Sequence, residues 1–252
     1  GLYAFGEVNY QYHGGTRLGA NALLSCIFDG LFCGYGVANY VRDVVKQPAA
    51  DAPAGIYERT LEREQAKVDR LISSTGGENP YLIGRELGEE MTAAATVVKT
   101  EERMLQAMDR LRELQERAER LSLSDTGMWT NQTLSWARAL GDMLKLAEVM
   151  LQGGIIRKES RGSHYRTDYP DRDDEQFLKT TIAKYDPETG RPEVSFEEVE
   201  TVIVTPRART YGKVDKEEGE EAKLPPNERE PSASGPEAGG AAKASQEAAA
   251  HQ

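Results

Sequence analysis

The sequence is poor in the residues that build covalently linked or metal-bound cores. Its 252 residues include two cysteines, Cys26 and Cys33, which form no CxxC motif, and three histidines, His13, His164 and His251, which are widely scattered. This spacing disfavours a disulfide framework and predicts no metal site. Stability must therefore come from burial of apolar surface, for which a chain of this length is sufficient.

Positive charge and long apolar runs are also scarce. Lys and Arg number 31 against 42 Asp and Glu, a formal net charge of −11, which argues against nucleic acid or an anionic membrane as a partner. The longest apolar run, 22–33, is broken by Ser25, Asp29 and Gly30 and is shorter than the roughly 18 residues that a membrane span requires. The sequence therefore predicts no membrane span. Because it starts at Gly1 without a signal-peptide pattern, we expect the natural N-terminus to lie upstream.

The first 46 residues are typical of the end of an α/β domain. An apolar stretch between glycines in 1–8 predicts a short buried strand, and the glycine-containing loop 9–19 follows it. From Asn21 onward, apolar residues recur every three and four positions, which predicts a helix packed inside an α/β layer. Prolines then mark a boundary between residues 46 and 57.

Residues 57–158 predict a helical domain. Amphipathic periodicity predicts a bundle of about four helices at 58–73, 80–98, 101–121 and 131–153. No inward-facing acidic pair or metal-ligand pattern occurs in them, so these helices alone indicate a structural or docking domain.

The C-terminal part predicts extended structure followed by a tail. In the region 159–212, segments 179–185 and 194–204 flank a turn sequence and predict a hairpin. Residues 213–252 contain no aromatic residue and few large aliphatic ones, so we expect a disordered acidic tail.

The loop that precedes the first helix could bind an anion or an electron-rich ring. Its glycines allow close backbone approach, the helix start presents unpaired N–H groups, and Arg17 offers a bidentate donor for a carboxylate. A tight turn whose Arg17 pairs with a surface acid explains the same spacing, and the spacing leaves both interpretations open.

The residues of two separate motifs carry a family resemblance. Segments 1–7 and 13–24, with the run Gly-Gly-Thr-Arg-Leu-Gly-Ala-Asn, together with 159–174, resemble the C-terminal portion of the flavoprotein subunit of succinate dehydrogenase and fumarate reductase. The resemblance covers roughly residues 1–210 and looks closer to the Gram-positive bacterial enzymes. L-aspartate oxidases share part of the loop and remain an alternative.

The resemblance implies roles for four residues. Arg17 would hold a carboxylate of succinate or fumarate, and Glu7 would accept hydrogen bonds from hydroxyls of FAD. Ala22 and Leu23 would offer backbone N–H groups to the flavin ring. Thr16 and Ala22 stand where the family often has Asn and Ser, so at Ala22 only a backbone contact is expected.

At the level of function, the resemblance implies oxidation of succinate to fumarate with FAD, electrons passing to an iron–sulfur subunit held by a membrane-anchor subunit. The protein would be cytoplasmic and peripheral to the cytoplasmic membrane through these partners. The dinucleotide-binding G-x-G-x-x-G half, the flavin-attaching histidine and the acid/base arginine are absent, so we expect no catalytic residue here and an inactive isolated chain. Fumarate reductase and a non-catalytic helical interaction module are the other interpretations.

Three further features have ordinary structural explanations. We expect structural roles for Arg161 and His164, and burial of Cys26 and Cys33 as small hydrophobic side chains. The charge run 171–174 is typical of a solvated face.

Overall fold

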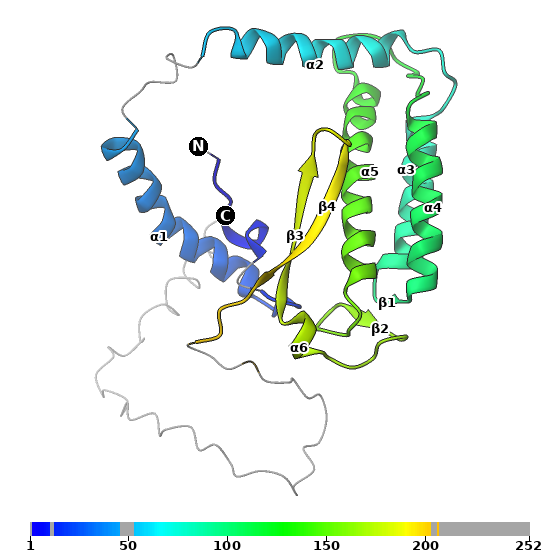
Figure 1. The fold of residues 1–252 in the computed structure, drawn as a ribbon. Helices are drawn as coiled ribbons and strands as arrows, with labels where there is room; N and C mark the ends of the chain where they lie inside the picture. Colours follow the sequence, from blue (N-terminus) through cyan, green and yellow to red (C-terminus); the bar gives the residue numbers. More distant parts are fainter. Residues whose placement is uncertain (1, 11–12, 46–52, 203–205, 207–252) are drawn as a thin grey trace, which may run out of the picture. The chain divides into compact units, whose positions relative to one another are not determined.

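The computed structural model describes residues 2–10, 13–45, 53–202 and 206, and the chain divides into two compact units, 1–200 and 201–252. The tail predicted at 213–252 lies outside the described residues. The elements that follow all belong to the first unit (Figure 1): η1 (Gly6–Val8), α1 (Asn21–Asp43), α2 (Ile56–Ser73), α3 (Pro80–Ala95), β1 (Val98–Lys99), α4 (Glu101–Ala118), α5 (Gln132–Ile156), β2 (Tyr165–Arg166), α6 (Asp174–Phe177), β3 (Lys179–Asp186) and β4 (Arg191–Glu198).

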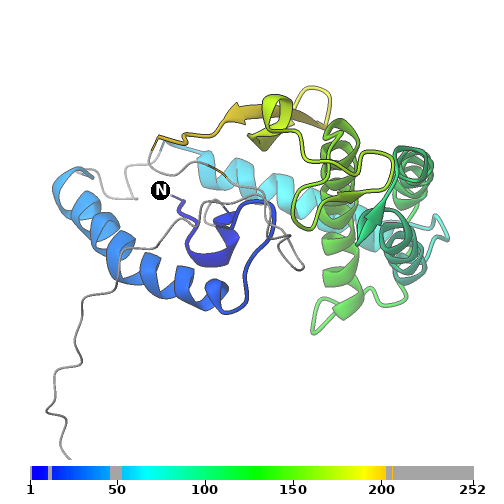
Figure 2. The same cartoon turned by 90° about the horizontal axis from the view of Figure 1, so that it is seen from below.

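The core lies among α3, α4 and α5, which pack side by side (Figures 1 and 2). Apolar side chains at helical spacing meet there, and those without exposed surface include Ile83, Met104, Leu114, Leu140 and Leu151. The helices predicted at 80–98, 101–121 and 131–153 are confirmed. The first ends early, at Ala95, because Val98 and Lys99 pair in parallel with β2.

Each of these three helices begins at a side-chain cap. Asn79 accepts a hydrogen bond from the Tyr81 N–H (2.9 Å), Thr100 from Arg103 (3.2 Å) and Asn131 from Leu134 (2.8 Å). Asn and Thr satisfy N–H groups that a helix leaves without an internal partner, which explains where these helices start.

The helix predicted at 58–73 is confirmed as α2, but it is not a full member of a four-helix bundle. None of its residues is buried, and it contacts α5 without entering the core. Leu61, on its apolar side, is exposed. The core is therefore made mainly by three helices, and α2 packs against it from outside through the partly buried Leu71 and Ile72.

The predicted hairpin is confirmed as β3 and β4. The two strands pair antiparallel in a register that runs from Lys179 opposite Glu198 to Asp186 opposite Arg191. The Asp186 carboxylate closes the turn by accepting from the Glu188 N–H (2.8 Å) and the Thr189 hydroxyl (2.7 Å). The second strand ends at Glu198, earlier than predicted, and residues 203–204 lie outside the described part.

The prediction of a buried strand at 1–8 is wrong. Leu2 to Phe5 are exposed and unpaired with any strand in the described part of the chain, and Gly6–Val8 form a 3-10 helix. A strand needs a neighbour to satisfy its backbone. Here the Gly6 N–H instead donates to the Asp29 carboxylate of α1 (2.7 Å).

The helix predicted after Asn21 is confirmed as α1, but its packing differs from expectation. Among its residues only Ser25 and Asp29 are buried, because its main contact is with η1. Cys26 is consequently exposed and Cys33 half-buried, so their predicted burial is wrong for this chain.

The expectation that no apolar segment is long enough to cross a membrane needs correction. Among the described residues, one helix, α1 with 23 residues, meets the length and composition of a membrane span. The helix continues past the run 22–33 that the sequence suggested. A helix enclosed by a larger soluble domain satisfies the same two criteria, so they do not distinguish the environments.

Candidate functional site

Two of the predicted site residues meet in the structure. The Arg17 Nε lies 2.6 Å from Glu7 Oε1, joining the loop before α1 to η1, and both side chains are about half exposed. A second guanidinium nitrogen, Nη1, donates to the Leu18 carbonyl at 3.4 Å. This geometry matches the interpretation of Arg17 as a partner of a surface acid, and it also places an accessible guanidinium beside the start of α1.

The other two predicted residues lie in the first turn of α1. Ala20 precedes this helix in a left-handed conformation (φ 65°) and supplies no side-chain cap. The Asn21 N–H donates to Leu18 O (3.2 Å) and the Leu24 N–H to Ala20 O (3.3 Å). Within the described residues the N–H groups of Ala22 and Leu23 are left for an external acceptor, and a helix start favours a negatively charged one.

Asp29 is a functional candidate that the sequence analysis missed. Its carboxylate is fully buried, accepts from the Gly6 N–H and lies 3.5 Å from the Cys33 Sγ. Desolvation and the neighbouring carboxylate raise the pKa of the Cys33 thiol. The thiol therefore stays protonated at neutral pH, which disfavours a redox role. Asp29 fixes η1, and with it Glu7, against α1.

The signature segment, residues 159–174, is organised around buried charge. Glu159 has no exposed surface; its carboxylate accepts from Arg157 (2.6 Å), from Arg161 (2.8 Å, through both oxygens) and from the Asp173 N–H (3.0 Å). Burial alone would raise the pKa of Glu159, but Arg161 and the other donors outweigh it and hold the pKa below its usual value. The carboxylate is therefore charged and fully coordinated.

Arg166 is the second buried charge of this segment. Its guanidinium pairs with both oxygens of Asp168 (2.8 and 2.6 Å) and donates to the Gly154 carbonyl near the end of α5 (2.9 Å). Asp168 in turn accepts from the Glu101 N–H at the start of α4 (2.8 Å), and Arg166 holds the pKa of Asp168 far below its usual value. The pair thus joins two core helices.

The charge run 171–174 is not simply a solvated face. Arg172 and Asp173 are half-buried; Asp173 caps α6, and Asp174 accepts from Arg161 at 2.7 Å. Asp174 thus joins the Glu159 cluster as a second carboxylate partner of Arg161, whereas Asp173 joins it through its backbone N–H, which donates to Glu159.

The side chains of Arg161 and His164 both contact other parts of the chain, and their structural role stays a prediction. Arg161 is held by Glu159 and Asp174, and His164 Nε2 lies 3.0 Å from the Arg157 carbonyl. Burial lowers the pKa of His164, so the imidazole is neutral near pH 7.

The signature segment also reaches the loop that carries Arg17. The backbone N–H and the hydroxyl of Ser163 both donate to the Gly15 carbonyl, at 3.0 and 3.1 Å. These residues are 148 positions apart, so no local pattern could have predicted the contact. The structure therefore brings together the two motifs that carry the family resemblance.

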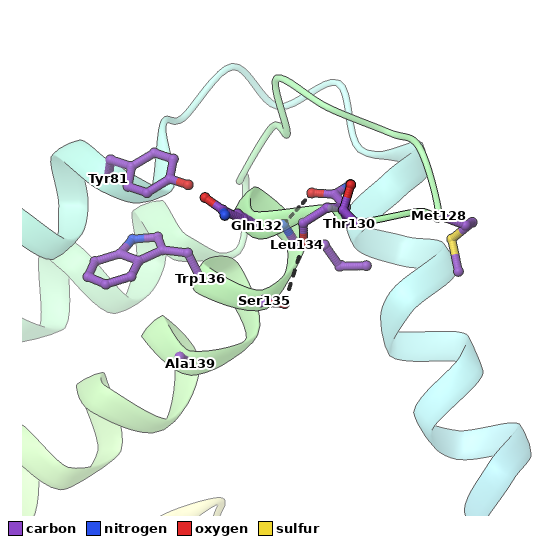
Figure 3. Close-up of a pocket in the computed structure, with 9 residues that line it drawn as sticks. Tyr81, Met128, Thr130, Gln132, Leu134, Ser135, Trp136 and Ala139 are labelled. Atoms are coloured by element: carbon purple, nitrogen blue, oxygen red, sulfur yellow. Dashed lines mark hydrogen bonds between the residues drawn. The ribbon is translucent and has the colours of Figure 1, made fainter.

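A separate cavity of about 800 Å³ lies where α3 and α5 begin (Figure 3). Its lining includes Tyr81 and Trp136, whose rings stack with centroids 5.5 Å apart, and none of its nine lining residues is charged. It lies at the opposite end of α5 from the signature segment, so it is not part of the Arg17 site. Among the described residues no cluster of His, Cys, Asp or Glu could hold a metal ion.

Comparison with known proteins points to one family. Residues 84–211 match the family described as fumarate reductase flavoprotein C-term. The succinate dehydrogenase flavoprotein subunit of Bacillus subtilis is 40% identical over 213 residues, which cover 84% of this chain and 36% of that protein. The fumarate reductase flavoprotein subunit of Escherichia coli is 35% identical over 219 residues, covering 84% and 35%.

Solved structures agree with this result. The quinol fumarate reductase of Escherichia coli superposes with a TM-score of 0.75 at 32% identity, covering 85% of this chain and 36% of that one. The Sdh1 of Mycobacterium smegmatis gives 0.71 at 28% identity, covering 79% and 33%. The chain thus spans about a third of the length of these relatives.

Proposed function

The chain belongs to the family of succinate dehydrogenase and fumarate reductase flavoproteins, and from this we propose that it is the C-terminal part of an FAD enzyme that oxidises succinate to fumarate. The observation that carries the proposal is the accessible Arg17 guanidinium beside the unsatisfied N–H groups that begin α1. A guanidinium that can bind a carboxylate and N–H groups that can bind an electron-rich ring are thereby adjacent.

Arg17 is suited to bind a substrate carboxylate because its present partner is easily exchanged. An exposed ion pair contributes only about 0 to 1 kcal/mol, so a dicarboxylate that displaces Glu7 from Arg17 loses little. The planar guanidinium then binds the carboxylate through two parallel hydrogen bonds. Displacement also frees Glu7 to accept hydrogen bonds from hydroxyls of FAD.

The start of α1 fits one edge of a flavin. The N–H groups of Ala22 and Leu23 are oriented by the helix and carry its partial positive charge, which stabilises negative charge on a reduced ring. FAD supplies the redox chemistry when bound, and these residues orient it and tune its charge. No residue of this chain is proposed to transfer the proton.

The exposed apolar side of α1 supports the idea that the flavin site is shared with a further part of the flavoprotein. Leu23, Leu24, Ile27, Leu31 and Phe32 are all largely exposed. Contiguous apolar surface of this kind is typical of an interface. We assign it to the dinucleotide-binding half of the FAD domain, which encloses α1 and supplies the missing catalytic groups.

The same proposal places the flavoprotein in a complex with an iron–sulfur subunit and a membrane-anchor subunit, at the cytoplasmic side of the cytoplasmic membrane. Electrons from the flavin would leave through the iron–sulfur subunit. The reverse reaction, reduction of fumarate, uses the same residues. A guanidinium that binds a carboxylate and N–H groups that contact the flavin serve both directions.

The test is to assay the complete flavoprotein with its FAD. We expect succinate to reduce an artificial electron acceptor, and the ratio of this rate to the rate of fumarate reduction gives the direction. L-aspartate is the control substrate, and preferential oxidation of aspartate would move the proposal to an L-aspartate oxidase. A flavoprotein loaded with FAD but inactive with all three would leave only the helical interaction module.

A matched measurement concerns the isolated chain. Because it offers one edge of the flavin site and no cradle for the pyrophosphate, we expect it to bind FAD weakly or not at all. A stoichiometric flavin spectrum after purification of the 252-residue chain would contradict the shared site.

A further inference from the structure

The signature segment contains a tight turn that touches the Arg17 loop, residues 13–19. Arg161 and His164 exchange both backbone hydrogen bonds, at 2.8 and 3.0 Å, around Gly162 and Ser163. Gly162 has a φ of +60°, a conformation that suits the first central residue of a two-residue hairpin turn and that side chains with a Cβ adopt at a cost. We refer to residues 161–164 as the 161–164 turn.

The turn and the loop are in close backbone contact. Besides the two hydrogen bonds from Ser163 to the Gly15 carbonyl, a Cβ on Gly162 would lie 2.4 Å from that same oxygen and 2.5 Å from the Thr16 hydroxyl. A Cβ on Gly15 would lie 3.1 Å from the Arg161 carbonyl. Gly162 therefore cannot carry a side chain unless the two segments move apart, and a side chain at Gly15 would need a smaller shift.

The turn is held rigidly from its other side. The Lys99 ammonium donates to the Ser163 carbonyl (3.3 Å) and to the Thr96 carbonyl (2.6 Å), and Arg161 is bound by the buried Glu159 carboxylate. Tyr10, which precedes the Arg17 loop, makes a separate contact, from its hydroxyl to the Thr181 carbonyl of β3 (3.4 Å). The 161–164 turn is thus a fixed support, and the exposed Arg17 loop is the part that it can place.

We propose that Gly162 and Ser163 are positioning residues for Arg17, acting through the Gly15 carbonyl, which lies two residues before the arginine. The inference rests on the proposed function, because Arg17 must bind the substrate carboxylate for its position to matter. The turn contacts neither substrate nor flavin. It fixes where the guanidinium is presented, and displacement of a binding group by about 1 Å costs on the order of a hundredfold in rate.

The main test is Gly162→Ala in the complete FAD-loaded flavoprotein. Its control is Gly190→Ala in the β3–β4 turn, where φ is +70° and the added Cβ meets only the Tyr185 hydroxyl at 3.8 Å. Both variants pay the same conformational cost, so both should lose melting temperature. Only Gly162→Ala also moves the Arg17 loop, so we expect its kcat/KM for succinate to fall about a hundredfold with flavin content retained.

Affinity for a dicarboxylate separates positioning from a general structural effect. Malonate, titrated against the flavin absorbance, should bind much more weakly to Gly162→Ala and normally to Gly190→Ala. Ser163→Ala, which removes only the hydroxyl bond, should weaken malonate binding about fivefold, the factor for one net hydrogen bond. This milder variant keeps the test informative if Gly162→Ala does not fold.

The outcomes distinguish a failure of the positioning role from a failure of the proposed function. If the wild-type flavoprotein binds malonate and oxidises succinate, but Gly162→Ala and Ser163→Ala match Gly190→Ala in malonate affinity and kcat/KM, the positioning role is wrong and the proposed function stands. If the wild-type flavoprotein neither binds malonate nor oxidises succinate, the positioning role and the proposed function are both wrong.

Discussion

The helical core and the N-terminal segment treat their apolar side chains in opposite ways. In α3, α4 and α5 the large aliphatic residues face one another and have almost no exposed surface. In α1, which is at least as apolar as any of these helices, the aliphatic and aromatic side chains are largely exposed, and the two buried residues, Ser25 and Asp29, are polar. The first region encloses its own apolar surface, whereas the second leaves most of its apolar surface exposed.

The helix ends show the same contrast. Asn79, Thr100 and Asn131 cap the core helices with side-chain oxygens, while α1 begins after Ala20 with no side-chain cap. A side-chain cap satisfies one of the N–H groups that a helix start leaves unpaired, and an uncapped start keeps more of them for another acceptor. The exposed apolar side chains and the uncapped start of α1 therefore mark this helix as the region where another molecule can bind.

The largest expected effect comes from equivalent truncations in the two regions. Leu140→Ala in the core, at 0% exposure, should lower the unfolding free energy of the chain by about 2 to 5 kcal/mol, because it leaves a cavity. Leu31→Ala in α1, at 57% exposure, should change it by about 0.5 kcal/mol or less. Urea unfolding of the 252-residue chain measures both.

The Leu31→Ala substitution has a different expected outcome in the complete flavoprotein. If the dinucleotide-binding half covers α1, Leu31→Ala should there become destabilising by about 1 to 3 kcal/mol, measured as a loss of thermal stability. An effect as small as that in the isolated chain would mean that this face of α1 stays exposed.

The second expected effect concerns Arg17. Arg17→Lys keeps the charge but loses the bidentate geometry, so kcat/KM for succinate in the complete flavoprotein should fall about a hundredfold, roughly 3 kcal/mol. Flavin absorbance should stay nearly unchanged. Steady-state kinetics with an artificial acceptor measure the loss, and near-normal kcat/KM would leave Arg17 as the partner of Glu7 alone.

Most of the fold could be predicted from the sequence where local patterns decide it. The helices of the core follow from apolar spacing, and the hairpin follows from two extended segments around the Asp186 turn. The segment 1–8 could not be predicted, because a strand depends on a neighbour elsewhere in the chain. The same reason explains Cys26, whose exposure depends on what covers α1.

The site residues stay a prediction of the motifs, and their arrangement in space could not be predicted at all. The motifs identified Arg17, Glu7 and the start of α1, yet the Arg17 pairing with Glu7 appears only in three dimensions. The contact between Ser163 and Gly15 joins distant segments, and one of its two hydrogen bonds uses only backbone atoms, which any residue possesses. The burial of Glu159 and Arg166 was hidden for a related reason, because the local sequence around a charged residue does not show whether it is buried.

A smaller effect is expected at the helix caps. Asn131→Ala removes the cap of α5 and the side-chain bonds to the carbonyls of Asp125 (2.7 Å) and Gly127 (2.9 Å). The unfolding free energy of the chain should fall by about 1 to 2 kcal/mol. Gln132→Ala, at the next position and outside these bonds, is the control. Equal stabilities of the two variants would show that the contrast between capped and uncapped helices carries little energy.

The smallest effect is a pH dependence at the 161–164 turn, where the two regions meet. Burial lowers the pKa of His164 in the folded chain, and the positive charges of Lys99, Arg166 and Arg157 act in the same direction. The unfolded chain therefore takes up a proton near pH 6.5, before the folded chain does, so the stability that neutral His164 contributes is complete above that pH and is lost as the pH falls below it. Glu159 and Asp168, whose pKa values are lowered, titrate only at more acidic pH and do not obscure this range.

Urea unfolding at pH 7.5 and 5.5 should show a decrease in the unfolding free energy of the wild-type chain at the lower pH. His164→Gln, whose amide can still donate to the Arg157 carbonyl, should show a smaller decrease. An identical decrease in both proteins would place the pH dependence in other groups. Protonation of His164 would then not loosen the turn.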